Sequence, residues 1–190
     1  MRFRYVRLFL FLILIVNVFR SERLFAQKLA IKSNTITLLS GIPNIGIEYS
    51  IAQRSTIELS YYHKYYELEN QGRFRFYISQ FEYKYWFCRE YVGGFLGTHI
   101  FLSEYNIGRL NAFNIRNYRY QGKAYASGLS IGYNYLLNRR WNLEMTLGFG
   151  YIRFEYEKFK CEHCGDLLDK EVMDCIGPTK VGVNLIYLIK

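Results

Sequence analysis

The sequence predicts an all-β protein, an eight-stranded antiparallel up-and-down transmembrane β-barrel. Three observations predict it: segments in which apolar and polar residues alternate, links that are alternately short and long, and a high aromatic content, with 19 Tyr and 15 Phe. The clearest alternation covers residues 141–151, whose odd positions are apolar and whose even positions are polar or glycine. An extended strand with this pattern has one apolar and one polar face, and its length matches the roughly 9–11 residues of a tilted membrane strand.

Four expected strands lie in the first half of the chain. Residues 28–40 form the first and end at a turn of composition Gly-Ile-Pro-Asn. Residues 45–51 form the second, with three Ile and one Tyr on one face. Residues 56–65 and 80–87 repeat the alternation, with Glu and Lys on the polar face. Each of these four segments therefore has one apolar and one polar face, and the alternation alone does not say which face points into the barrel.

Four further strands complete the expected barrel. Residues 93–105 form the fifth, although two parities compete in it because Phe95 and Leu96 are adjacent. Residues 128–135 form the sixth, residues 141–151 the seventh, and residues 180–189 the last. The count of eight is even, as in bacterial outer-membrane barrels of a single chain.

The links indicate which end of the barrel is which. Those after the second, fourth and sixth strands are short, whereas residues 67–73, 106–120 and 157–177 form longer polar connections. Outer-membrane barrels have short periplasmic turns and longer extracellular loops. We therefore expect periplasmic termini and surface display through residues 106–120 and 157–177. A soluble barrel would reverse the two faces, and the abundant aromatic residues favour the membrane orientation.

The start of the chain predicts export. Three Arg precede the apolar run 8–19, and small Ala26 follows, which is the layout of a secretory signal peptide. We expect a signal peptide over residues 1–26 and an outer-membrane β-barrel over residues 27–190. An uncleaved anchor is the alternative, because Leu24 is bulky for a cleavage site.

Partners and cofactors are constrained by the charge and the export signal. Several arginines of the leader contribute to the net charge of +9. The sequence contains no clustered basic patch of the kind that would indicate binding to nucleic acid. We expect a monomer in the cell outer membrane that contacts outer-membrane lipid and the barrel-insertion machinery. No cofactor, metal site or cofactor-binding residue is predicted.

The polar parity carries ionisable residues that would face the interior. An eight-stranded barrel encloses space that side chains just fill, and unpaired charge there would be costly. We therefore predict an interior core of ion pairs; a proton or ion path is the alternative. Its expected members are Glu48, Glu58, Lys64, Glu82, Lys84, Glu144 and Lys180.

Four cysteines remain as candidates for covalent or metal chemistry. Cys88 lies in a short link, a membrane thickness away from the others, which exceeds the reach of a disulfide. In an oxidising compartment we expect one disulfide in the last long connection, between Cys175 and either Cys161 or Cys164. A zinc site formed by these three cysteines and His163 is the alternative.

Histidine and serine residues raise the question of catalysis. His99 and Ser103 share a parity, but residues four apart on a strand are separated by about 13 Å, too far for a nucleophile and its base. His63 and His99 are expected at the membrane interface. We therefore predict no enzymatic activity and no catalytic residues.

Several short motifs occur in order along nearly the whole mature chain. They are Pro43-Asn44-Ile45-Gly46-Ile47-Glu48, Tyr85-Trp86-Phe87-Cys88, Phe95-Leu96-Gly97 with His99, Tyr105-Asn106-Ile107-Gly108, Trp141-Asn142-Leu143-Glu144, Cys161-x-x-Cys164-Gly165 and Gly177-Pro178-Thr179-Lys180. In these motifs the chain resembles the small Bacteroidetes, hence Gram-negative, outer-membrane barrels catalogued as domain of unknown function 3575. This resemblance implies an uncharacterised outer-membrane barrel, sometimes associated with surface fimbria systems, and supplies no catalytic residues. The sequence departs from the family pattern at Phe81 and in its first strand.

The last strand and the loops complete the functional expectations. Lys180, Gly182, Leu185 and Tyr187 fit the spacing of a barrel-insertion signal, although the chain ends in Leu-Ile-Lys rather than on an aromatic residue. We expect a structural or surface-recognition role through the extracellular loops. The alternatives are an outer-membrane lipid-modifying enzyme, of acyl transferase or lipase type, and an accessory protein of a surface fimbria system.

Overall fold

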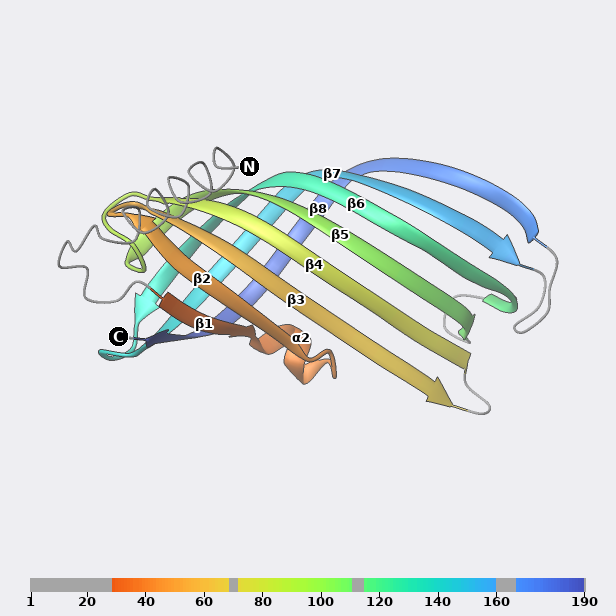
Figure 1. Cartoon of the computed structure of the whole chain (residues 1–190), viewed down its shortest axis with the longest axis horizontal. Coiled ribbons are helices and arrows are strands. Elements are labelled where there is room, and N and C mark those ends of the chain that lie inside the picture. Colours follow the sequence, from red (N-terminus) through yellow and green to blue (C-terminus); the bar gives the residue numbers. More distant parts are fainter. Residues whose placement is uncertain (1–28, 69–71, 111–114, 160–166, 190) are drawn as a thin grey trace, which may run out of the picture.

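A computed structural model describes residues 29–68, 72–110, 115–159 and 167–189 and confirms the predicted all-β, eight-stranded antiparallel up-and-down barrel. The eight strands are antiparallel and follow one another in chain order around a closed barrel (Figure 1). The strands are β1 (Leu29–Asn34), β2 (Asn44–Ala52), β3 (Ser55–Leu68), β4 (Gly72–Trp86), β5 (Gly93–Leu110), β6 (Ile115–Leu136), β7 (Trp141–Phe159) and β8 (Leu167–Ile189).

The first strand is shorter than predicted. It ends at Asn34, and the chain then forms the short helix α2 (Thr35–Leu39). The Asn34 side chain caps this helix by accepting a hydrogen bond from the Ile36 N–H at 3.1 Å. The prediction of a strand over residues 28–40 is therefore confirmed for Leu29–Asn34 and wrong beyond Asn34, because a local cap ends the strand there. No helix among the described residues is long and apolar enough to cross a membrane.

The long polar connections are mostly strand. Residues 67–73, 106–120 and 157–177 were predicted as loops, but β3 to β8 continue through most of them. Neighbouring strands remain paired through these segments, as Glu157 on β7 is with Lys170 on β8. This pairing satisfies the backbone of both strands, and the loop prediction was wrong for this reason. β6 and β8 reach 22 and 23 residues, about twice the length that crosses a membrane.

The barrel is complete only near the chain termini. β1 pairs with β8 from Leu29 to Asn34, and β2 pairs with β3 no further than Tyr62. Beyond these pairs the other six strands continue as a curved sheet, seen in Figure 1 at the end away from the C-terminus. We call this extension the distal sheet; it comprises residues 63–68, 72–77, 104–110, 115–123, 155–159 and 167–172.

An apolar plug fills the barrel at the end with the termini. The plug comprises the buried residues Ala30, Trp86, Tyr91, Phe95, Ile186 and Leu188. The Trp86 and Phe95 rings lie 4.8 Å apart, and Phe95 occupies space that only glycine leaves open, since a Cβ on Gly132 would lie 2.4 Å from its ring. Tyr91, in the link between β4 and β5, donates a hydrogen bond to the Glu48 carbonyl at 3.2 Å.

The apolar face of each strand points outward in the closed part. On β7, Leu147 and Phe149 are 62% and 60% exposed, whereas Asn142, Glu144 and Thr146 are buried. The same alternation recurs on β2, where Ile45 and Ile47 are exposed, and on the other strands. The arrangement is the reverse of a soluble barrel, which places its apolar face inside.

Candidate functional site

Two lysines and three glutamates meet at the centre of the closed barrel. Lys32 Nζ lies 2.8 Å from Glu48, 2.9 Å from Glu58 and 2.8 Å from Glu144. Lys84 Nζ contacts the same three carboxylates at 3.0, 2.8 and 2.8 Å. All five side chains are at most 2% exposed. Each ammonium group therefore has three carboxylate partners, which compensates for its removal from water.

A third lysine extends this group toward the distal sheet. Lys180 forms a short contact with Glu82 and lies 3.5 Å from Glu58 Oε1. The Ser130 hydroxyl also donates to Glu82. We call the seven residues Lys32, Glu48, Glu58, Glu82, Lys84, Glu144 and Lys180 the ion-pair cluster. It contains four carboxylates and three ammonium groups.

The structure brings six of the seven predicted interior residues together and adds one. Lys32 was missed because the register of the first strand could not be read from its sequence. Lys64 lies further along β3, where its Nζ donates to the Ser40 carbonyl at 3.1 Å, beside the end of α2. The shorter β1 makes room for α2 at this level. The cluster and the apolar plug both lie in the interior of the closed barrel.

The histidines considered for catalysis lie in separate environments. His99 is 1% exposed, and its Nε2 lies 2.8 Å from the Thr179 hydroxyl rather than near Ser103. His63 is on the outward parity of β3, and its ring stacks on Tyr77 with the centroids 4.9 Å apart. The residues are thus not assembled around one reacting position.

Two of the four cysteines are described. Cys88 is an exposed free thiol in the link between β4 and β5, and Cys175 is a half-buried free thiol on β8, opposite Ile152. Cys161 and Cys164, with which Cys175 was expected to pair, lie outside the described residues, as does His163. Within the described part of the chain, no group of three or more His, Cys, Asp and Glu is placed to hold a metal ion.

The insertion-signal residues alternate along β8. Lys180 and Gly182 point into the barrel, and Leu185 and Tyr187 point outward. The Tyr187 ring lies 5.0 Å from that of Trp141, and its hydroxyl accepts a hydrogen bond from Arg140 at 3.1 Å. These contacts join β8 to the start of β7 at the end with the termini.

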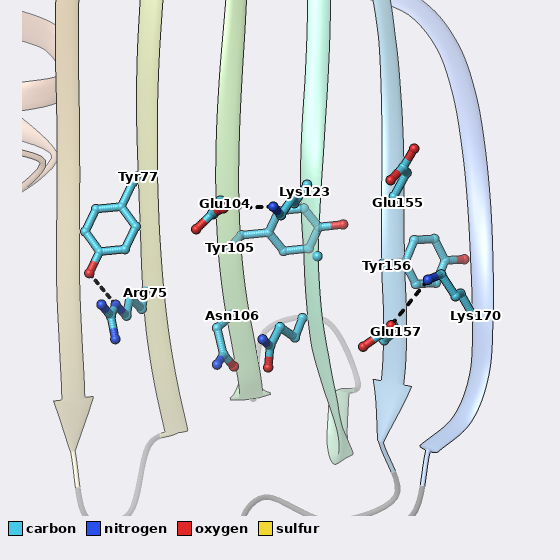
Figure 2. A pocket seen from close by; sticks show the side chains of 12 residues that line it. Arg75, Tyr77, Glu104, Tyr105, Asn106, Lys123, Glu155, Tyr156, Glu157 and Lys170 are labelled. Carbon is cyan, nitrogen blue, oxygen red and sulfur yellow. Dashed lines mark hydrogen bonds and ion pairs between the residues drawn. The ribbon is translucent and has the colours of Figure 1, made fainter.

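A pocket of about 500 Å³ lies on the distal sheet, across β4 to β8. Most of its side chains lie on the outward-facing side of the sheet, in two rows that run across the strands and are two residues apart along each strand (Figure 2). Tyr105, Gly122 and Tyr156 lie between these rows in register. We call this site the distal pocket; it is lined by Arg75, Tyr77, Glu104, Tyr105, Asn106, Gln121, Gly122, Lys123, Glu155, Tyr156, Glu157 and Lys170.

Charged side chains of the distal pocket are mostly paired. Lys170 Nζ lies 3.6 Å from Glu157, a pair marked in Figure 2 together with Lys123 and Glu104. Arg75 donates to the Tyr77 hydroxyl, and its guanidinium carbon lies 4.9 Å from the Tyr77 ring centre. Arg75 thus holds this ring with a cation–π contact.

Hydrogen bonds at the distal pocket set the protonation of two groups. The pKa of Tyr156 is raised to about 12, chiefly because its hydroxyl donates to Glu171. The hydrogen bond and charge of Glu104 raise the pKa of Lys123. Near neutral pH, Tyr156 is therefore an uncharged phenol and Lys123 is a cation. Three cations and three carboxylates line the distal pocket, so their charges balance.

The distal pocket was not predicted, because several of its residues were assigned to loops. A signal was nevertheless present in the sequence. Glu104 continues the parity of apolar Leu102, and Lys123 that of Tyr125. Outward side chains that change from apolar to charged, without loss of the alternation, indicate that the strand continues beyond its apolar band.

A comparison with protein families places the whole described barrel in one family. A family model described as protein of unknown function (DUF3575) matches residues 8–189. No curated protein shows significant similarity to the chain. The match covers nearly the full sequence and confirms the resemblance seen in its motifs. The chain belongs to the DUF3575 family.

Proposed function

We propose that the protein is an outer-membrane β-barrel whose closed part is an anchor and whose distal sheet recognises a ligand at the cell surface. The observation that carries this proposal is the reversed polarity of the closed barrel. Large apolar side chains such as Leu129, 72% exposed, cover the outside, while the seven charged side chains of the ion-pair cluster are buried inside. Water would penalise this exterior, whereas lipid favours it.

The length of the apolar exterior fits a bilayer. On β6 the outward side chains from Tyr125 to Tyr135 are apolar or aromatic apart from Ser127, and Lys123 follows one step beyond. This band of about 11 residues is the length of a tilted transmembrane strand. Aromatic residues at its two ends correspond to the girdles of membrane barrels.

A role in anchoring and recognition is favoured over one in diffusion. The apolar plug and the ion-pair cluster occupy the interior of the closed part, leaving paired charges rather than a water-filled channel. The ligand-sized distal pocket, in contrast, lies outside the barrel lumen. We therefore propose that the interior is structural and that recognition occurs on the distal sheet.

Cysteine labelling of intact cells tests the location and orientation. In a variant with Cys161, Cys164 and Cys175 replaced by serine, Cys88 should react with a membrane-impermeant maleimide only after the cells are lysed. In a second variant that also carries Cys88→Ser and Lys123→Cys, intact cells should be labelled. Lys123 is exposed on the distal sheet, with 57% of its side chain accessible. Labelling of Cys88 in intact cells, or fractionation of the protein away from the outer membrane, would refute the proposal.

A lipid-modifying enzyme is the second candidate, and one contact favours it. His99 Nε2 and the Thr179 hydroxyl are 2.8 Å apart, within the distance at which a base activates a hydroxyl nucleophile. Purified protein should be assayed for deacylation and acyl transfer on lipopolysaccharide, with His99→Ala and Thr179→Val. If the unmodified protein is active and both variants lose this activity, the protein is an enzyme and the recognition proposal is refuted. We expect no activity.

A further inference from the structure

The distal pocket begins where the outward face changes from apolar to polar. On β7, outward Tyr151 is followed two residues later by Arg153 and then by Glu155 of the distal pocket. On β6, Tyr125 is likewise followed by Lys123. If the tyrosines mark the membrane interface, the distal pocket lies directly above it and faces sideways along the membrane surface.

One row of the distal pocket contains two neighbouring amide side chains. Asn106 and Gln121 are register partners on β5 and β6, and Arg75 and Glu157 follow in the same row on β4 and β7. Amides both donate and accept hydrogen bonds, whereas the guanidinium only donates and the carboxylate only accepts. A ligand that both donates and accepts at many positions matches the mixed donors and acceptors of this row.

The charge balance argues against an ionic ligand. Lys123 and Lys170 already have carboxylate partners at 3.2 and 3.6 Å. An anion would have to displace these carboxylates, and a cation would have to displace the ammonium groups. A neutral ligand rich in hydroxyl groups can add hydrogen bonds without breaking either pair.

Aromatic rings complete the chemistry of the distal pocket. The Tyr77 ring stacks on His63 with an angle of 10° between the planes, and Arg75 also contacts it. Tyr77 is thus held in place before any ligand binds, which lowers the entropy lost on binding. Rigid tyrosines offer an apolar surface with a polar tip, which suits the C–H and O–H groups of a sugar ring.

We propose that the distal pocket binds a neutral saccharide, supplied by the sugar chain of the glycolipid in the outer leaflet. Its volume of about 500 Å³ lies within the roughly 300–1,000 Å³ of small-molecule sites. The saccharide chemistry follows from the lining residues alone. The glycolipid source rests on the proposed function, since only membrane insertion places the distal pocket beside the leaflet.

Calorimetry with purified, folded protein in detergent tests the saccharide site. The probe is the oligosaccharide released from lipopolysaccharide by mild acid and then dephosphorylated. The variant Asn106→Ala/Gln121→Ala should bind it at least about tenfold more weakly, equal to about 1.4 kcal/mol. Ser127→Ala, exposed on the same outward face but outside the distal pocket, should bind like the unmodified protein. Retention of the heat-modifiable folded form verifies that each variant is intact.

The saccharide site would be overturned if the unmodified protein did not bind the oligosaccharide, or if the double variant bound it equally well. Binding that disappears when the oligosaccharide is dephosphorylated would also overturn it, because the distal pocket would then be an anion site. A second arm uses protein in nanodiscs that contain intact lipopolysaccharide, with unlinked oligosaccharide as competitor. Binding of the free sugar without binding of the intact glycolipid would refute the glycolipid source only. Failure of the cysteine-labelling experiment would refute the membrane location and leave the calorimetric result standing.

Discussion

Lys84 and Glu144 face each other inside the barrel, with Nζ 2.8 Å from Oε2, although 60 residues separate them in the sequence. Lys84 on β4 and Glu144 on β7 are both fully buried. The contact crosses the lumen, because the two strands are not neighbours in the sheet. It is therefore closure of the barrel that brings the charges together.

Replacing Lys84 by methionine should strongly destabilise the folded barrel. The substitution keeps most of the side-chain volume but removes an ammonium group that contacts Glu48, Glu58 and Glu144. Breaking a buried pair in this way costs about 3–5 kcal/mol. Urea unfolding of the protein in lipid vesicles measures the change; a loss below about 1 kcal/mol would contradict a buried, interdependent cluster.

Replacing Glu82 by glutamine should cost less than replacing Lys84. The ion-pair cluster has one more carboxylate than ammonium groups, and this substitution removes the excess charge while retaining an acceptor for Lys180. Part of the lost attraction is then offset by weaker repulsion among the remaining carboxylates. The same unfolding measurement should rank Glu82→Gln as milder, and the reverse order would show that charge balance does not govern the interior.

An arginine on the outer face tests whether the closed barrel, unlike the distal sheet, is embedded in a membrane. Leu147 is 62% exposed on the apolar exterior, and Leu147→Arg should destabilise the inserted barrel by about 2–4 kcal/mol if it meets lipid near the midplane. Val172 is 51% exposed in the distal sheet, and Val172→Arg is the matched control. We expect it to have little effect on refolding into vesicles; equal effects would refute a membrane boundary between the two positions.

The protonation of Tyr156 should follow its contact with Glu171. Because Glu171 raises the pKa of this phenol to about 12, ionisation in the folded protein should occur above the ordinary value near 10. The contact then contributes stability below about pH 10 and loses it between about pH 10 and 12. Nuclear magnetic resonance of ¹³Cζ-labelled tyrosine, assigned with Tyr156→Phe, measures the titration. The variant Glu171→Gln should return the midpoint toward 10, and an unchanged midpoint would exclude the contact.

Local features of the sequence determine the strands and the two faces of each strand. Successive side chains on a strand point to opposite sides, so the alternation along residues 141–151 specifies both sets of side chains without knowledge of neighbours. The same rule identified Glu144, Glu82 and Lys84 as members of one polar face. Eight strands in chain order also follow, because short links favour pairing of sequential strands.

Only the tertiary structure decides which charges meet, where the first strand ends and how far the other strands extend. Lys32 joins the ion-pair cluster through the register of β1 between β2 and β8, which depends on residues far away in the sequence. The distal pocket likewise requires β4 to β8 to be aligned so that Asn106 meets Gln121. Alternation is a property of a single strand, whereas register and closure depend on many strands. For this reason the sequence alone determined the strands of the barrel, and only the tertiary structure decided which residues form its site.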